Sequence, residues 1–300
     1  MSATLSSLSA ASEKFVNDFS IWVEDYLQQQ VIKKNFVELL FESKSYSLKS
    51  GGKRFRPFLV YLVSQLWSVP IEQIKNYCLA VEMVHTYSLI HDDLPCMDND
   101  DFRRGQPTNH KKFGEDIALL AGDALLTEAF YLISHDHHLT ADCKMSLVAL
   151  LSEKIGSFGM VGGQVLDMKA VSSASEIENQ LKKIEQIHLM KTGYLIQAAA
   201  VGGAVLAQVH SQALQFVSDF SLQLGLAFQI KDDLLDVHDH EQDFKSYVSV
   251  LGVEQTQHAL FKTSTAAIES LIHLKSEKNI NLQAIELLFL LVEYNQIRTS

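Results

Sequence analysis

The stretch EMVHTYSLIHDDLPCMDNDDFRRGQPTNH, residues 82–110, is the most informative part of this sequence. Its first ten residues continue an apolar run, spaced like one face of a helix, that ends directly in Asp92 and Asp93. Pro95 disfavours the α conformation of the residue before it, so we expect the helix to end or kink there. Such a break would return Asp98 to the neighbourhood of Asp92. The stretch therefore predicts a long buried helix that carries a cluster of carboxylates at its end.

Apolar residues recur at three- and four-residue spacing along nearly the whole chain, which predicts helices almost everywhere. The expected helices cover residues 13–31, 35–49, 56–67, 71–94, 115–134, 142–169, 176–207, 211–237, 253–277 and 281–294. No convincing alternating strand is found; residues 248–251 are a candidate for a short one, which would stand alone. The chain has only four prolines, and long helices need such a scarcity of breakers. We expect an all-α fold in which residues 1–300 form a single domain, a bundle of about ten helices around a central cavity.

A second acidic cluster lies in FQIKDDLLDVHDH, residues 228–240. Asp232 and Asp236 are four residues apart and so share one face of a helix, with Asp233 beside them. Carboxylates this close repel one another unless cations compensate. Ligands that are all oxygen favour Mg²⁺ over zinc, and Mg²⁺ completes its shell with water and phosphate. Solvated acidic helix ends are the alternative for either cluster alone. The two clusters together favour a diphosphate clamped by Mg²⁺.

Basic residues gather in KSGGKRFRP, residues 49–57, which places Lys53, Arg54 and Arg56 beside two glycines. Arg103 and Arg104 add a second pair. Arginine grips phosphate oxygens in bidentate fashion, although a solvated turn before a helix explains the first run as well. The formal net charge of −11 argues against a general nucleic-acid binder, which needs a basic face.

Five motifs in the same order carry a family resemblance over nearly the whole chain. They are GGKRFRP (51–57), the stretch 82–110, GMVGGQVLDM (159–168), HLMKTGYLI (188–196) and FQIKDDLLDV (228–237). In these motifs the chain resembles the trans-isoprenyl diphosphate synthases, most closely the bacterial-type farnesyl diphosphate synthases, or geranyltranstransferases. The resemblance implies an isoprenoid-synthase helical fold and a Mg²⁺-dependent prenyltransferase. Such an enzyme joins isopentenyl diphosphate head to tail to dimethylallyl or geranyl diphosphate, through an allylic carbocation, and releases farnesyl diphosphate and diphosphate.

The resemblance also implies a role for each matching residue. Three Mg²⁺ ions would bind with the allylic diphosphate, at the metal residues Asp92, Asp93, Asp98, Asp232, Asp233 and Asp236. The catalytic set would be Arg103 and Lys191, which contact the allylic diphosphate, and Thr192 and Gln229, which point oxygen dipoles at the carbocation. The isopentenyl diphosphate pocket would contain Lys53, Arg56, His85 and Arg104, and Gln164 and Asp167 would line the same cavity. The released diphosphate would accept the proton, so no side-chain base is expected.

Product length is predicted from the residues before the first cluster. Tyr87 lies five residues before Asp92, and Ser88 lies four before it. In the family that the chain resembles, an aromatic side chain here acts as a floor for the growing product. With the longer DDLPCMD spacing, this favours a fifteen-carbon product. The alternative for Tyr87 is an ordinary core aromatic.

The chain departs from the family in VHDHEQDFKSYVSVLG, residues 237–252. The family usually has a longer loop here, with a Gly-Lys-x-x-Gly-x-Asp element followed by Lys-x-Thr-Tyr, and this chain lacks several of these residues, including the first Gly-Lys. Lys245 takes the place of the second lysine, and Asp243 is a candidate substitute for a lost aspartate. This loop normally helps to close the site, so a weakly active or regulatory relative is an alternative.

Three different functions compete with this prediction. One is the same fold making a longer, geranylgeranyl product. A terpene cyclase is disfavoured because its second metal motif is usually of an Asn-Ser-Glu type. The last is a di-iron bundle, which would use the pairs Glu82-x-x-His85 and Glu185-x-x-His188 with Glu128 or Glu153. A di-iron site would leave both aspartate clusters unexplained.

Location and assembly are expected as follows. The N-terminus shows neither the basic region nor the apolar region of a secretory signal. The most apolar stretch, residues 194–209, is shorter than the ~20 residues of a membrane span and contains Gln197. We therefore expect a cytoplasmic protein without a membrane span. The family resemblance implies a homodimer.

Overall fold

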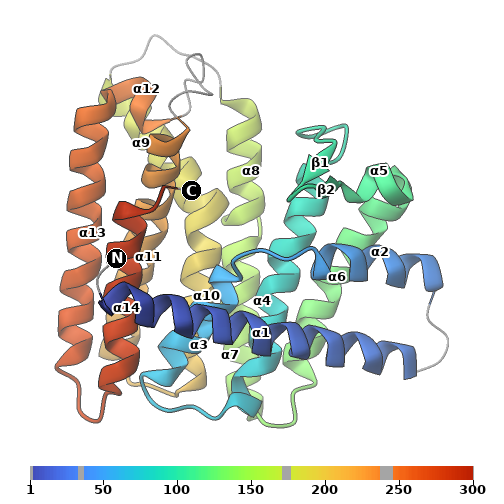
Figure 1. Cartoon of the computed structure of the whole chain (residues 1–300), viewed down its shortest axis with the longest axis horizontal. Helices are drawn as coiled ribbons and strands as arrows, with labels where there is room; N and C mark the ends of the chain where they lie inside the picture. The colour runs from blue at the N-terminus through green and yellow to red at the C-terminus, as the bar shows by residue number, and fades with distance from the viewer. Residues whose placement is uncertain (1–2, 33–36, 171–176, 237–245, 300) are drawn as a thin grey trace. The chain divides into compact units, whose positions relative to one another are not determined.

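A computed structural model of the chain describes residues 3–32, 37–170, 177–236 and 246–299. These residues are almost entirely helical, which confirms the all-α prediction (Figure 1). The helices are α1 (Ala3–Ile32), α2 (Glu38–Lys49), α3 (Phe55–Gln65), α4 (Ile71–Asp92), α5 (Asn109–Phe113), α6 (Glu115–Ser134), α7 (Ala141–Ile155), α8 (Met160–Lys169), α9 (Ile177–His188), η1 (Leu189–Gly193), α10 (Tyr194–Leu206), α11 (Ser211–Leu235), α12 (Tyr247–Leu251), α13 (Val253–Lys275) and α14 (Leu282–Ile297). A two-residue antiparallel ladder joins β1 (Phe102–Arg103) to β2 (Gln106–Pro107).

The chain forms two compact units. The first unit consists of Ser9–Phe58 and Pro70–Met145, and it contains the first aspartate motif with the Gly-Gly turn. The second unit consists of Met1–Leu8, Leu59–Val69 and Ser146–Ser300, and it contains the second aspartate motif. A single domain around one central cavity stays a prediction.

Helix α4 is the buried centre of the first unit and packs along α6. Its side chains are buried on all sides between Ile74 and Ile90, as expected for a helix that is apolar most of the way round. Helix α6 also carries Glu128, whose carboxylate accepts hydrogen bonds from the Lys44 ammonium and from the Tyr26 hydroxyl, the latter at 2.6 Å. These contacts tie α1 and α2 to the middle of α6.

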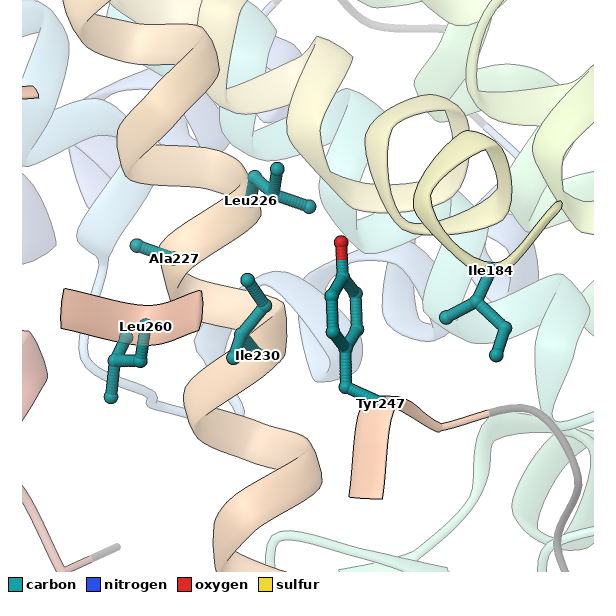
Figure 2. Close-up of a cluster of buried hydrophobic side chains, with 6 residues drawn as sticks. All are labelled: Ile184, Leu226, Ala227, Ile230, Tyr247 and Leu260. Carbon is teal, nitrogen blue, oxygen red and sulfur yellow. The ribbon is translucent and has the colours of Figure 1, made fainter. Parts of the chain in front are cut away.

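Helix α11 is the centre of the second unit and packs along α13, with α10 and α14 also against it. Near its C-terminal end lies a cluster of buried apolar side chains (Figure 2). There the ring of Tyr247 stands between Ile230 of α11 and Ile184 of α9. This cluster supports the last turns of α11, which carry the second aspartate motif.

Three details differ from the sequence prediction. The helix expected over 142–169 is two helices, because residues 156–159 turn tightly and a side chain on Gly159 would collide with the backbone of Lys154. The candidate strand at 248–251 is instead helix α12. The Ser246 hydroxyl accepts a hydrogen bond from the Ser249 amide at its start, and Gly252, with φ +78°, ends it. The π-helical turn η1 was not expected inside the helix over 176–207.

Three helical stretches are long and apolar enough to cross a membrane, as judged by length and composition alone. They are Glu115–Ser134, Ala141–Lys169 and Ile177–Leu206. The third stretch contains Gln197, whose side-chain amide donates to the Ser218 hydroxyl of α11 at 2.9 Å. A helix buried in the centre of a soluble bundle and a helix that spans a membrane have the same apolar composition, so composition alone does not distinguish between them.

Candidate active site

The first aspartate motif forms a tight turn after α4. The helix ends at Asp92, and the backbone amide of Asp98 donates to the Asp92 carbonyl at 2.8 Å. The Leu94 carbonyl accepts from the amide of Asn99, which has φ +56°. The turn therefore returns Asp98 to Asp92, as the proline in the motif predicts. Asp92 is half-buried and Asp98 is exposed.

Arg103 holds the buried carboxylate of Asp93. Its Nε lies 2.7 Å from Asp93 Oδ1, and one terminal nitrogen lies 2.6 Å from the same oxygen. The Asp93 side chain is almost fully buried, and burial raises its pKa while the Arg103 guanidinium opposes the rise. Asp93 is thus committed to Arg103. The more accessible Asp92 and Asp98 are better placed to receive a cation.

The Gly-Gly turn serves as a seat for Arg104. The guanidinium donates to the Gly51 carbonyl, and it lies so close to Gly52 that a Cβ there would be 2.7 Å from its central carbon. Gly52 also has φ +111°, a conformation that side chains rarely adopt. The two glycines therefore place Arg104 beside the basic run that follows them.

The Arg54 side chain points into the protein, so it cannot bind phosphate as the run of basic residues 53–56 suggested. It is buried, has φ +48°, and pairs with the buried Glu82 at 2.5 Å. Its other terminal nitrogen donates to the Leu48 carbonyl at 2.6 Å. Lys53 stays exposed and Arg56 half-buried on either side of it. Arg54 is thus a structural residue of this turn.

His85 lies next to Arg56, with 3.3 Å between His85 Nε2 and an Arg56 terminal nitrogen. Burial, followed by the positive charges of Arg56 and Arg104, lowers the pKa of His85 well below its ordinary value. A neutral imidazole can accept a hydrogen bond from Arg56. The first unit therefore brings together three of the four residues predicted to bind isopentenyl diphosphate. Their role stays a prediction.

Tyr87 is buried below the first aspartate motif. Its ring meets the His91 ring edge-on, with 5.7 Å between ring centres. Burial and the nearby Asp92 charge raise the pKa of Tyr87 to about 12, so the phenol is neutral. The Ser88 hydroxyl donates back to the His85 carbonyl at 2.9 Å. Tyr87 is thus a buried, neutral aromatic side chain five residues before Asp92, and its role as a floor for the product stays a prediction.

In the second unit, protein donors reach both carboxylate oxygens of Asp232. Oδ1 accepts from Arg298 at 2.5 Å, and Oδ2 accepts from the Gln229 side chain at 3.1 Å. Burial raises the pKa of Asp232, and Arg298 opposes the rise. Arg298 is buried and also donates to the Phe228 carbonyl. Sequence reasoning missed Arg298, because a lone arginine after the last helix carries no motif.

Asp233 is bound to the protein on two sides. One of its oxygens lies 3.0 Å from His188 Nε2 and accepts the backbone N–H of Tyr247 at 2.7 Å. The rings of His188 and Tyr247 lie nearly parallel, with 5.8 Å between centres. Asp236, by contrast, is exposed at the end of α11. Asp233 thus joins α9, α11 and the start of α12.

Lys191 and Thr192 lie in the π-helical turn η1. The Lys191 ammonium donates to Asp167 of α8 at 2.6 Å. Gln164, one turn earlier on α8, has a buried side-chain amide without a hydrogen-bond partner in the described part of the chain. A buried amide of this kind is costly unless a ligand or water satisfies it. That Gln164 lines a ligand cavity stays a prediction.

The carboxylates suit Mg²⁺ in their chemistry. Among the described residues, no three His, Cys, Asp or Glu side chains form a ready-made metal site. Mg²⁺ typically uses one or two carboxylates and takes its other ligands from water and substrate phosphate. Asp92 and Asp98 can supply such carboxylates in the first unit, and Asp232 can supply one in the second unit. Lys245 and Asp243 lie outside the described residues.

Comparison with known proteins gives one consistent family. Residues 37–249 match the polyprenyl synthetase family. The chain is 41% identical to a farnesyl diphosphate synthase of Bacillus subtilis, with 82% of this chain and 86% of that protein aligned. It is 39% identical to a geranylgeranyl diphosphate synthase of Cyanophora paradoxa, with 78% and 81% aligned. A solved FPP/GFPP synthase of Zymomonas mobilis matches with a TM-score of 0.84 at 31% identity, over 97% of this chain and 99% of that one.

The chain belongs to the polyprenyl synthetase family. This confirms the family predicted from the five motifs and makes the chain a prenyltransferase. The two names among its relatives leave the product length open. The di-iron alternative also loses its ligands, because Glu82 is paired with Arg54 and His188 with Asp233.

Proposed function

We propose that this polyprenyl synthetase makes farnesyl diphosphate from isopentenyl diphosphate and dimethylallyl or geranyl diphosphate. The observation that carries this choice is Tyr87, a buried aromatic side chain directly below the first aspartate motif. A chain growing down from Asp92 would meet its ring. The alternative is a geranylgeranyl product, which the name of the Cyanophora relative favours.

The two aspartate motifs would hold the allylic diphosphate together, with Arg103 and Lys191 as further cationic contacts. Asp92, Asp98 and Asp232 would be the principal ligands of up to three Mg²⁺ ions, and Asp236 would stand nearby. Bound Mg²⁺ supplies neutralisation of the charge that develops on the leaving diphosphate.

Asp93 and Asp233 would contribute by holding Arg103, His188 and the start of α12 in place, because their side chains are only 4% and 12% exposed, whereas the side chain of Asp232 is 34% exposed. The metal-ligand role predicted for these two residues thus becomes, in our proposal, mainly a framing role.

The groups around the reacting carbons need to be polar without being bases. Thr192 and the carbonyl oxygen of Gln229 would direct their dipoles at the allylic cation. The Gln229 amide nitrogen donates to Asp232, which leaves its oxygen for this purpose. The released diphosphate would accept the proton.

Isopentenyl diphosphate would bind to Lys53, Arg56, His85 and Arg104. The contact of Arg56 with His85, and the seat of Arg104 on the Gly-Gly turn, support this pocket. A neutral His85 still carries one ring N–H, which can donate a hydrogen bond to a phosphate oxygen.

We further propose a cytoplasmic homodimer without a membrane span. Apolar side chains are exposed in pairs on two helices: Leu119 with Leu120 on α6, and Val161 with Val165 on α8. Grouped apolar side chains indicate a protein contact, whereas single ones are ordinary on a surface. A second copy of the chain would cover such faces. The ion pair of Glu128 at the middle of α6 favours a protein environment over lipid for that helix.

The decisive experiment incubates purified protein with Mg²⁺, isopentenyl diphosphate and either dimethylallyl or geranyl diphosphate, and identifies the product by mass. A C15 product that disappears with EDTA supports the proposal. A C20 or longer product keeps the prenyltransferase and refutes the Tyr87 floor. No product from folded protein would favour the weakly active or regulatory relative suggested by the short 237–252 segment.

A further inference from the structure

The turn η1 interrupts what would otherwise be one helix from α9 through α10. The amide of Tyr194 bonds the carbonyl of Leu189, five residues back, in place of the usual four. This turn therefore holds one extra residue, and Lys191 and Thr192 do not follow the α-helical periodicity of α9 and α10. Such single π-turns are rare overall and are frequent at functional sites.

Two glycines on neighbouring helices press against the backbone of this turn. A Cβ added to Gly225 of α11 would lie 2.8 Å from the Cα of Gly193. A Cβ added to Gly163 of α8 would lie 2.8 Å from the Cα of Lys191 and 2.7 Å from the carbonyl carbon of Met190. Both contacts are with backbone atoms, which cannot swing aside as a flexible side chain can. The turn is therefore gripped between α8 and α11.

The side chain of Lys191 is fixed from the same direction. Its ammonium bonds Asp167, which lies one helical turn after Gly163 on α8. Helix α8 thus contacts both the backbone of Lys191, through Gly163, and its side chain, through Asp167. We propose that Gly163 and Gly225 are positioning residues that set the place of Lys191 and Thr192 by gripping η1. This inference rests on the proposed function, which gives those two residues their role at the allylic substrate.

The expected effect of a methyl group follows from the distances. To bring a Cβ on residue 225 from 2.8 Å to an ordinary contact of 3.4–4 Å, the turn or α11 must move by about 1 Å. A misplacement of about 1 Å near reacting groups can cost on the order of 100-fold in rate. Gly225→Ala should therefore lower kcat by 10- to 100-fold, as a rough estimate.

Gly203→Ala is a matched control. Gly203 lies in α10, beyond the turn, and a Cβ there would lie 2.8 Å from the backbone oxygen of Val60. The two substitutions insert the same methyl group, against backbone at the same distance, in helices of the same unit. Only one of the two sites touches η1.

The test compares kcat and both KM values for wild type, Gly225→Ala and Gly203→Ala, each corrected for the folded fraction. We expect Gly225→Ala to lose kcat and to raise KM for the allylic diphosphate, with KM for isopentenyl diphosphate unchanged. Gly203→Ala should keep wild-type kinetics per folded molecule. If both variants lose kcat alike, or if Gly225→Ala behaves as wild type, the glycines do not position the turn.

Hydrogen exchange gives a readout that does not depend on activity. In Gly225→Ala, the amides of residues 189–194 should exchange faster than in wild type, and in Gly203→Ala they should not. Should Gly225→Ala fail to fold, Gly163→Ala tests the same turn from α8. An inactive wild type would refute the proposed function, while unchanged exchange in the turn would refute the glycine grip.

Discussion

The buried pair between Arg54 and Glu82 allows a quantitative prediction. Both side chains are almost fully buried, and they meet at 2.5 Å. Removing one partner from such a pair leaves an uncompensated charge in the interior and costs about 3–5 kcal/mol. We therefore expect Glu82→Leu and Arg54→Met each to lower the free energy of unfolding by about that amount.

The double variant should lose far less than the sum of the two. It buries no charge, and its main defect is the Leu48 carbonyl, which loses the donor now supplied by Arg54. An unsatisfied buried carbonyl costs roughly 1–3 kcal/mol. The double variant should thus be no less stable than either single variant, so the two sites should be coupled by several kcal/mol.

The assay is urea unfolding of all four proteins with linear extrapolation. Lys14→Met is the matched control, because it breaks the exposed pair of Lys14 with Asp18 in the same unit and should cost less than about 1 kcal/mol. Single variants that cost as little as this control, or losses that add within about 0.5 kcal/mol, would refute the account of a buried ion pair.

Three further predictions concern individual residues. Burial and the charge of Arg56 lower the pKa of His85 in the folded chain. Below about pH 6.5, His85 therefore binds a proton in the unfolded chain but stays neutral in the folded chain. Wild type should therefore lose melting temperature on acidification below that pH more steeply than His85→Gln, and equal slopes would contradict this. Tyr87→Ala should shift the product to C20 or longer, as shown by mass, whereas an unchanged C15 product would assign the length limit to other residues. Asp233→Asn should speed hydrogen exchange at the start of α12 and leave the affinity for Mn²⁺ with inorganic diphosphate within about threefold, whereas Asp232→Asn should weaken that affinity by tenfold or more; the reverse pattern would make Asp233 the metal ligand.

The helices and the first aspartate turn could be predicted because the signals are local. Apolar spacing marks the helices, and Pro95 marks the turn that returns Asp98 to Asp92. The second aspartate motif could be placed at the end of α11 for the same reason.

What could not be predicted depends on contacts between distant parts of the chain. Nothing in the run of basic residues distinguishes Arg54 from Arg56, because its partner Glu82 lies 28 residues away. The π-turn has the apolar composition of an ordinary helix, and the glycines that grip it come from other helices. At residues 248–251, the β-branched residues favour a strand, but the cap at Ser246 decides for a helix.

The hydrogen bond from the Tyr247 amide to Asp233 has a consequence for how this region can vary between relatives. It acts as a clasp that joins the exit of α11 to the entry of α12, whatever the number of residues between them. Loop-closure entropy grows slowly, by roughly 0.6 kcal/mol for each doubling of length. Relatives with more residues between Asp236 and Ser246 should therefore keep nearly the same melting temperature, as long as this hydrogen bond is kept. The length of the chain between α11 and α12 can thus differ among relatives at little cost in stability, because one hydrogen bond holds the ends of these two helices together.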